Sequence, residues 1–364
     1  MRVAIIHYWL VQMRGGERVL EHLCRMYRDA DIFTHVVDRT AMSATILQHD
    51  IFQTFIARLP LATRHYQKYL PLMPRALEAL DLSAYDLVIS CEAGPAKGVI
   101  TRPDAVHVTY CHSPMRYLWD QYPQYHADGG PAARLLMPLF APSLRMWDTV
   151  SAARPDRIMA NSAYIRRRIA KSWGRDATVV YPPVDTRLFA SAPFATDEYL
   201  WVGQLVPYKR PDLAIDAFNR SGRNLHVIGD GAMLPVLQAQ AGPSIRFTRR
   251  LGFTALREAY ASARALVFTA EEDFGLIPVE VMASGRPVIA FARGGAVETI
   301  VADETGVFFG EKTVEALLEA LDRFEAWLPD FDPQRAITRA HAFSPERFRT
   351  EFTAVVAAAV QDRG

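Results

Sequence analysis

Short runs of apolar residues alternate with helical patterns along the whole chain. The runs are continuous, which is typical of strands that are buried on both faces of a parallel sheet. The first series of runs covers 3–7, 32–37, 87–91, 106–111, 158–160 and 178–181. A second series covers 199–202, 225–228, 245–247, 266–269, 288–291 and 307–309. This alternation predicts parallel sheets with helices on both faces.

A turn-rich stretch around Pro182 and Pro183 separates the two series. Twelve strands exceed what one open sheet comfortably holds, and the break gives six strands to each side. We therefore expect an α/β protein with two doubly wound, Rossmann-like domains that face each other across a cleft. The N-terminal domain is predicted to span 1–183 and the C-terminal domain 184–343. Ligands of such sheets bind beyond the carboxyl ends of the strands, so the loops after the strands are the candidate sites.

Composition and charge fit an ordinary globular protein of two domains. The chain has 364 residues, is 50% hydrophobic and carries a net charge of +1, which excludes a disordered chain. No stretch reaches the roughly 18 uncharged apolar residues of a membrane span, and we expect no signal peptide before the first strand. The cysteines, Cys24, Cys91 and Cys111, lack metal-ligand spacing and are expected to be buried and reduced. We expect a cytoplasmic protein without a nucleic-acid partner.

The most informative motif follows the apolar run 266–269. Glu272 and Glu280 stand on either side of a turn at Phe274 and Gly275, and the turn leads into a helical pattern. A strand, a glycine turn and a helix start place free backbone N–H groups beside carboxylates. Amides suit phosphate and acids suit hydroxyls, so the motif predicts a site for a sugar on a diphosphate. This arrangement points toward a glycosyl transferase.

Two cations precede a helical pattern in the second half of the chain, Lys209 and Arg210. Each charge-assisted hydrogen bond from such a cation to a diphosphate contributes about 1.5–3 kcal/mol in a shielded site. A solvated charge pair is the alternative interpretation. A glycosidase would use Glu272 and Glu280 as acid and nucleophile, but that function leaves the two cations and the glycine turn without a role.

Two motifs in the N-terminal half follow strands. Gly15 and Gly16 open a helix after the first strand, so their N–H groups can face an anion or a hydroxyl. The dinucleotide fingerprint is absent there, which disfavours a nicotinamide oxidoreductase. His112 follows the run 106–111 and can bond a sugar hydroxyl, and Arg116 can meet an anionic group.

The chain contains two D-x-D strings, a pattern that holds a divalent cation in some sugar transferases. Asp29 and Asp31 precede a strand instead of following one, and Asp330 and Asp332 lie in a loop flanked by proline. Both pairs are therefore interpreted as surface acids. We expect no metal ion, and the cations at the site would neutralise the phosphate charge.

With these residues in view, the chain resembles the family 4 retaining glycosyltransferases of the two-domain GT-B fold. The resemblance covers nearly the whole chain. Within the family, the chain is similar to the bacterial mannosyltransferases that build lipid-linked polysaccharide units, through His-Ser-Pro-Met-Arg-Tyr-Leu-Trp-Asp and Val-Pro-Tyr-Lys-Arg-Pro-Asp. The segments that carry the resemblance are 15–17, 112–120, 181–185, 202–210, 272–285 and 294–295.

The resemblance implies donor-binding roles in the C-terminal domain. Lys209 would contact the donor diphosphate, Glu280 the ribose, and Glu272 the hydroxyls of the donor sugar. The backbone amides of three further residues would help to hold the donor: Phe274, Gly275 and Leu276.

In the N-terminal domain, His112 would bind the donor sugar and join Lys209 and Glu272 as a catalytic group. Gly16 would line the donor phosphate, and Gly15 and Arg116 the acceptor.

One residue departs from the family pattern. The family usually has Arg directly after the glycine that ends the first strand of the second domain, and this chain has Gln204. A neutral amide neutralises phosphate less well, unless Arg210 or another cation substitutes. We therefore expect Gln204 to contact the donor but to neutralise its phosphate charge less well than Arg would.

The implied reaction moves mannose from GDP-mannose to a lipid-linked glycan in polysaccharide biosynthesis, retaining the anomeric configuration and needing no cofactor beyond the nucleotide-sugar donor. Two alternatives are a transferase that uses a UDP-sugar and a sugar-nucleotide-binding pseudoenzyme. The family also implies that the C-terminal helix, predicted within 344–364, packs back on the N-terminal domain.

The N-terminal half is basic, and two of its segments, 58–75 and 134–147, mix basic, aromatic and apolar residues. Such segments can lie on an anionic membrane and collect a lipid-diphosphate acceptor, which would place the protein peripherally on the inner face of the membrane. Ordinary helix packing explains these segments equally well.

Overall fold

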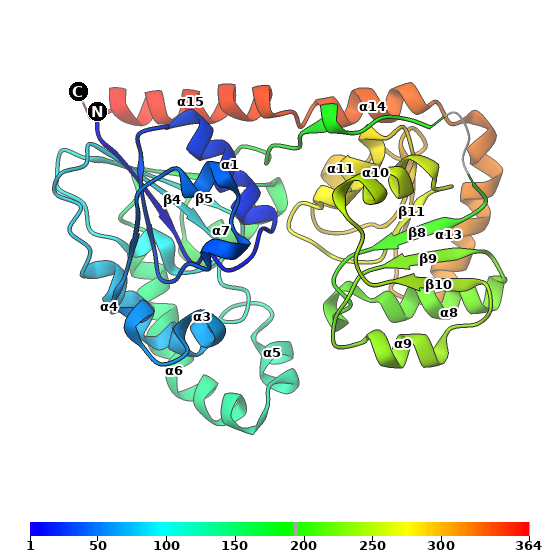
Figure 1. Ribbon diagram of the computed structural model, residues 1–364, viewed down its shortest axis with the longest axis horizontal. Helices are drawn as coiled ribbons and strands as arrows, with labels where there is room; N and C mark the ends of the chain where they lie inside the picture. Colours follow the sequence, from blue (N-terminus) through cyan, green and yellow to red (C-terminus); the bar gives the residue numbers. More distant parts are fainter. Residues whose placement is uncertain (193–195, 364) are drawn as a thin grey trace. The chain divides into compact units, whose positions relative to one another are not determined.

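The computed structural model describes residues 1–192 and 196–363. The chain divides into two compact units, each with its own parallel sheet (Figure 1). Unit 1 comprises Met1–Pro182 and the C-terminal segment from Phe348, and unit 2 comprises Pro183–Arg347. The architecture is that of two Rossmann-like domains, as the sequence predicts.

The sheet of unit 1 has the strand order β3-β2-β1-β4-β5-β6-β7, and the sheet of unit 2 has the order β10-β9-β8-β11-β12-β13. The strands of unit 1 are β1 Val3–His7, β2 Asp31–Thr34, β3 Ile51–Gln53, β4 Leu87–Glu92, β5 Val106–Cys111, β6 Arg157–Ala160 and β7 Thr178–Val179. Those of unit 2 are β8 Tyr199–Val202, β9 Leu225–Ile228, β10 Ile245–Thr248, β11 Leu266–Phe268, β12 Val288–Phe291 and β13 Gly306–Phe309.

The α-helices of unit 1 are α1 Gly15–Met26, α2 Ala44–Leu47, α3 Ala62–His65, α4 Met73–Glu78, α5 Tyr122–Asp128, α6 Pro131–Ser151 and α7 Ala163–Trp173. Those of unit 2 are α8 Pro211–Ser221, α9 Leu234–Gln240, α10 Phe253–Ser262, α11 Leu276–Ala283, α12 Ala296–Thr299, α13 Val314–Trp327 and α14 Pro333–His341. Helix α15, Pro345–Gln361, follows α14 and continues into unit 1. Over residues 1–192 and 196–363, no helix has the length and apolar character needed to cross a membrane.

Short 3₁₀ helices complete the connections. They are η1 Arg39–Ala41, η2 Phe55–Arg58, η3 Tyr66–Leu72, η4 Pro95–Gly98, η5 Thr186–Leu188, η6 Pro207–Lys209 and η7 Leu328–Asp330.

The prediction of six strands in the N-terminal sheet is wrong, because the structure adds β3. This strand lies at the sheet edge, is three residues long, and leaves Phe52 and Gln53 exposed, so it lacks the continuous apolar run of a central strand. The predicted run 32–37 is also too long. Strand β2 ends at Thr34, and the chain then turns so that the His35 amide donates to the Tyr8 carbonyl.

The sheet of unit 1 is covered on both faces because successive side chains of its central strands point to opposite sides. Ile5 of β1 lies in a core that includes residues of α1 and α15, whereas Ile6 lies in a core with residues of α4 and η4. Helix α15 therefore forms part of the interior of unit 1 and runs beside α1 (Figure 1). Its buried side chains are Phe348, Phe352, Val356 and Ala359.

In unit 2, helices α8 and α13 pack with the strands in one core that contains Tyr199, Phe218 and Phe324. Helix α11 is buried from Pro278 to Ala283, and it packs against β11, β12 and α14. A helix that is apolar all round must be enclosed in this way. The enclosure fixes α11 rigidly, and its first turn lies at the carboxyl edge of the sheet.

Both sheets contain a topological switch point, where successive crossovers leave in opposite directions. The switch lies between β1 and β4 in unit 1 and between β8 and β11 in unit 2. The loops beyond the carboxyl ends of these strands are the usual ligand sites of open parallel sheets. The motifs containing Gly16 and Lys209 follow β1 and β8, and the motif containing Glu272 follows β11.

The burial of α15 predicts that unit 1 depends on this helix for stability. Replacing Phe352, which is fully buried, with Ala should lower the free energy of unfolding of unit 1 by about 3–5 kcal/mol, because the change leaves a cavity. Val360→Ala, on an exposed face of the same helix, should change it by less than about 0.5 kcal/mol. Urea denaturation measures both values, and equal effects would contradict the packing described.

Candidate functional site

An ion pair joins the loops after β8 and β11 in unit 2. Lys209 Nζ lies 2.6 Å from Glu272 Oε1, and the two side chains are 14% and 20% exposed. Charges that are this close and mostly shielded attract each other more strongly than a surface pair does. The structure thus brings together two of the predicted catalytic residues, one cationic and one anionic.

Lys209 is held in place through its backbone. The hydroxyl of Thr269 donates to the carbonyl oxygen of Lys209 at 2.7 Å, and the indole N–H of Trp201 donates to that hydroxyl at 3.0 Å. Thr269 is fully buried, so the two hydrogen bonds form away from solvent. Sequence reasoning missed both positioning residues. The available signal was a polar residue that ends the apolar run 266–269.

The glycine pair at 294–295 packs directly on the loop that carries Glu272. A Cβ atom on Gly294 would lie 2.4 Å from the Glu272 carbonyl oxygen, and one on Gly295 would lie 2.3 Å from Cα of Phe274. The Gly295 amide also donates to the Glu272 carbonyl at 2.8 Å. Only residues without a side chain permit this approach, so the two glycines fix the backbone next to the ion pair.

Similar close packing holds the loop after β8. A Cβ atom on Gly229 would lie 1.9 Å from the Gly203 carbonyl oxygen, and one on Gly231 would lie 2.4 Å from the Leu205 carbonyl oxygen. The Leu205 amide donates to the carbonyl of Asp230 at 2.9 Å. The segment that leads to Lys209 is therefore braced by the loop after β9.

Glu280 lies within α11 and is 5% exposed. Its Oε2 accepts a hydrogen bond from the Tyr260 hydroxyl at 3.0 Å, a partner that the sequence did not reveal. Gly275 has a φ of +88°, a left-handed conformation that favours glycine, and α11 begins at the next residue, Leu276. Phe274 is buried against Phe343. The predicted amides thus lie at the start of α11, next to the loop of Glu272.

Gln204 and Arg210 lie close to Lys209 in sequence but differ in environment. Gln204 is exposed after β8. Arg210 has a left-handed φ of +53°, and its guanidinium pairs with Asp212 at 2.9 Å, at the start of α8. The Asp212 carboxylate therefore already neutralises Arg210, the residue named above as a substitute for the positive charge that is missing at Gln204.

In unit 1, the glycine turn of α1 lies beside an aromatic and a histidine side chain. A Cβ atom on Gly16 would lie 2.6 Å from the Tyr8 hydroxyl oxygen and 3.6 Å from His112 Nε2. The His112 amide donates to the Glu92 carbonyl at 2.7 Å, and its Nε2 lies 3.2 Å from Cys91 Sγ. The predicted residues Gly16 and His112 thus share one site, with Gly15 next to them at the first position of α1.

A buried carboxylate supports this turn. Glu17 is 2% exposed, and its Oε2 accepts from the Arg14 amide at 3.0 Å, which caps α1. Burial raises the pKa of Glu17, but the neighbouring His7, 3.6 Å away, and the backbone amides outweigh it and lower that pKa overall. Glu17 is therefore ionised at neutral pH. Sequence reasoning did not assign roles to Glu17, His7 or Tyr8, although an acid directly after two glycines was a visible signal.

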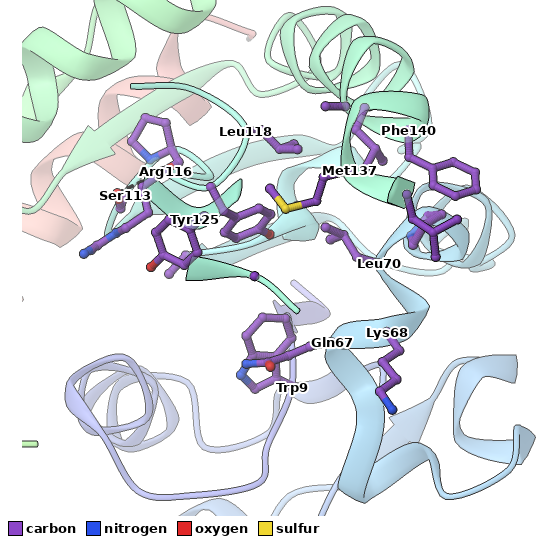
Figure 2. A pocket seen from close by; sticks show the side chains of 18 residues that line it. Trp9, Gln67, Lys68, Leu70, Ser113, Arg116, Leu118, Tyr125, Met137 and Phe140 are labelled. Carbon is purple, nitrogen blue, oxygen red and sulfur yellow. Dashed lines mark hydrogen bonds between the residues drawn. The ribbon is translucent and has the colours of Figure 1, made fainter. Parts of the chain in front are cut away.

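Arg116 belongs to a different feature of unit 1. It lines a cavity of about 870 Å³, together with residues of η3, α5 and α6 (Figure 2). Of the two residues predicted to bind the acceptor, Gly15 opens α1 and Arg116 lines the cavity.

The acidic strings have structural partners. Asp31 begins β2 and accepts hydrogen bonds from Tyr85 and Arg2, and Asp332 caps α14 through the Gln334 amide. In the part of the chain that the structure describes, no group of three or more His, Cys, Asp or Glu side chains is placed to hold a metal ion. The three cysteines are free and buried, as the sequence predicts.

The environment of His112 predicts a measurable pH effect. Burial, and to a smaller extent the neighbouring His7, lower the pKa of His112 to about 3, whereas an unfolded histidine has a pKa of about 6.5. Because the unfolded chain binds the proton more readily, stability falls as the pH drops below about 6.5. His112→Gln should reduce the loss of unfolding free energy between pH 7.5 and 5.5 by about 1.4 kcal/mol. Urea denaturation at the two pH values tests this, and an unchanged loss would contradict it.

Two family models match consecutive parts of the chain. Residues 13–188 match "Glycosyltransferase Family 4", and residues 191–327 match "Glycosyl transferases group 1". The solved structure of Anabaena Alr3699/HepE in complex with UDP superposes with a TM-score of 0.73 at 15% identity, covering 98% of this chain and 100% of that one. This likeness shows the shared GT-B fold.

Relatives with assigned activities are similar over part of the chain. A GDP-mannose-dependent alpha-(1-6)-phosphatidylinositol monomannoside mannosyltransferase of Mycolicibacterium smegmatis is 29% identical over 48% of this chain and 53% of its own length. The O-antigen chain mannosyltransferase RfbU of Salmonella typhimurium is 26% identical over 50% of this chain and 58% of its own. The chain spans about half the length of the curated relatives it matches. With both halves matched in order on the GT-B fold, the chain belongs to the family 4 glycosyltransferases, a family of transferase enzymes.

Proposed function

We propose that the protein transfers mannose from GDP-mannose to a lipid-linked glycan, with retention of the anomeric configuration and without a metal ion. The observation that carries this proposal is the Lys209–Glu272 pair, set at the switch point of unit 2 beside the first turn of α11. A cation, a carboxylate and helix-start amides are the groups that a sugar diphosphate needs.

In the proposed reaction, Lys209 bonds the diphosphate and neutralises the charge that grows as the bond to the sugar breaks. Glu272 accepts hydrogen bonds from the sugar hydroxyls, and Glu280 from those of the ribose. The acceptor hydroxyl bonds to the anomeric carbon on the face that the diphosphate leaves. Its proton passes to the departing phosphate oxygen, so the products are the extended glycan and a nucleoside diphosphate.

Neutral His112 suits the sugar side of this reaction. With its pKa near 3, the imidazole is uncharged at neutral pH and offers one hydrogen-bond donor and one acceptor. A charged imidazole would repel the cationic character that develops on the sugar as the diphosphate leaves. Gly16 leaves open the space beside His112 that a side chain would fill.

The identity of the donor rests on the relatives. The Mycolicibacterium relative is named as GDP-mannose-dependent, and RfbU is named as a mannosyltransferase. The structure of HepE holds UDP, so a UDP-sugar is the second candidate donor. Gln204 motivates the third candidate, a pseudoenzyme that binds a nucleotide sugar without turnover. Unit 2 carries the groups that all three candidates require.

The acceptor and the cellular location belong to the same proposal. The Mycolicibacterium relative is named for a phosphatidylinositol mannoside acceptor, which is a lipid. We place this protein in the cytoplasm, bound peripherally to the anionic inner face of a membrane. The basic and apolar segments of unit 1 support this location.

A thermal-shift screen of nucleotide sugars tests the donor. A ligand that binds only the folded protein stabilises it by about 2.7 kcal/mol at 100 times its Kd. We expect GDP-mannose to raise the unfolding temperature more than GDP-fucose, UDP-glucose or UDP-GlcNAc at equal concentration. A larger shift with a UDP-sugar would replace GDP-mannose as the donor, and no shift with any of them would remove the proposed donor site.

Replacing either member of the ion pair tests the reaction. Lys209→Met and Glu272→Ala should each lower the rate of sugar transfer or donor hydrolysis at least about 100-fold, because each removes a group that stabilises the transition state. Arg220→Met breaks a surface ion pair of unit 2, with Glu315, and should leave the rate nearly unchanged. Wild-type rates in the first two variants would exclude these roles, and donor binding without any wild-type turnover would favour the pseudoenzyme.

A further inference from the structure

The cavity in unit 1 has a mostly apolar wall. It measures about 870 Å³ and is bounded by η3, by the loop after β5 and by helices α5 and α6 (Figure 2). The apolar side chains of the wall include Leu70, Leu118, Met137, Phe140 and Leu144. A cavity of this size suits a small ligand, and such a wall offers little to the hydroxyls of a sugar. A wall of this kind suits a hydrocarbon ligand.

The polar groups of the cavity are cationic or neutral. Lys68 and Gln67 come from η3, and Arg116 comes from the loop after β5. Figure 2 shows the charged ends of Lys68 and Arg116 pointing away from the apolar side chains, so they lie at the rim. The described residues that line the cavity include no Asp or Glu. The rim therefore favours an anionic group attached to the apolar occupant.

Helix α6 presents apolar side chains on two opposite faces. Met137 and Leu144 face the cavity. Leu135, Leu139 and Met146 are 77%, 67% and 67% exposed, and their spacing of four and then seven residues places them on one outward stripe. An exposed apolar stripe on a helix marks a surface that contacts another apolar phase, and a membrane surface is such a phase.

A buried ion cluster fixes α6 to the rest of unit 1. Asp148 of α6 pairs with Lys97 of η4, and its Oδ2 accepts from the indole N–H groups of Trp119 and Trp173, both at 2.7 Å. Lys97 and Asp148 are fully buried, so separating them would leave an uncompensated charge in the interior. The C-terminal half of α6 is thereby held in place, and with it the cavity wall at Leu144.

We propose that this cavity holds the hydrocarbon chain of the acceptor lipid. The phosphate or diphosphate of that lipid meets Lys68 at the rim, and the outward stripe of α6 contacts the membrane from which the lipid enters. The inference rests on the proposed function in one respect, namely that the acceptor is a lipid. The location of the chain, the charged rim and the entry face come from the cavity itself.

Two detergent-free probes test the site on the full-length chain: farnesyl phosphate, an isoprenoid, and dihexanoyl phosphatidylinositol, an acyl lipid. We expect saturable binding of at least one by titration calorimetry, and the tighter probe identifies the source of the lipid. Farnesol, which lacks phosphate, should bind at least about tenfold more weakly than farnesyl phosphate. Failure of both lipids to bind, in protein that still shows a thermal shift with its nucleotide sugar, would overturn the inference and leave the donor site intact.

Matched substitutions on α6 separate the two faces. Met137→Glu places a charge in the cavity wall and should weaken the tighter probe at least about tenfold. Leu139→Glu makes the same change of charge on the outward stripe. It should leave probe binding unchanged and reduce sedimentation with anionic vesicles at low salt. Equal probe affinity in wild type and Met137→Glu would overturn the cavity assignment, and unchanged sedimentation of Leu139→Glu would overturn the entry face.

A further variant guards against misfolding of Met137→Glu. Lys68→Glu changes the rim, so the packed wall is untouched. It should weaken the binding of farnesyl phosphate several-fold more than the binding of farnesol, because only the phosphate senses the rim charge. Equal losses for the two ligands would contradict a phosphate-binding rim.

Discussion

The attraction between Lys209 and Glu272 is the interaction on which the site in unit 2 depends. It forms at 2.6 Å between two loops that follow adjacent strands. Glycines at 229, 294 and 295 let the neighbouring loops after β9 and β12 pack directly on these two loops. The hydrogen bonds through Thr269 and Trp201 then fix the backbone of the lysine. In the proposed reaction, a diphosphate that takes up Lys209 leaves Glu272 available to hydroxyls. On the same proposal, the pair holds both groups in place, with their charges balanced, before the nucleotide sugar binds.

Unit 1 uses the same physical means with different residues. The turn that opens α1 is fixed by a buried carboxylate, Glu17, which binds the backbone at Arg14 and lies beside His7. The position of this turn sets the distances from Gly16 to Tyr8 and His112. In unit 1, the buried Glu17 fixes the backbone of the turn. In unit 2, hydrogen bonds through Thr269 and closely packed glycines fix the backbone instead.

The sequence predicted the strands well where burial is continuous, as in β1, β5, β8, β9 and β12, whose bounds match the apolar runs. It missed β3 because a short edge strand needs no continuous apolar run. It named Lys209, Glu272, Gly16 and His112 from their places after strands. It could not identify Trp201 or Tyr260, since a hydrogen bond between residues far apart in the sequence leaves no local pattern. The cavity was equally hidden, because segments 58–75 and 134–147 line a hollow only after they pack together.

Helix α15 also bears on how the chain is made. Unit 1 contains the whole N-terminal half of the chain, yet its interior is completed by four residues of the last helix: Phe348, Phe352, Val356 and Ala359. A ribosome that has translated unit 1 up to Pro182 has therefore made a sheet with one face covered by α1 but still lacking α15. Because α15 follows unit 2 in the chain, that face is completed only after all of unit 2 has been synthesised. Nascent unit 1 is consequently the stage at which this protein most needs a chaperone, since exposed apolar surface on an unfinished domain promotes aggregation.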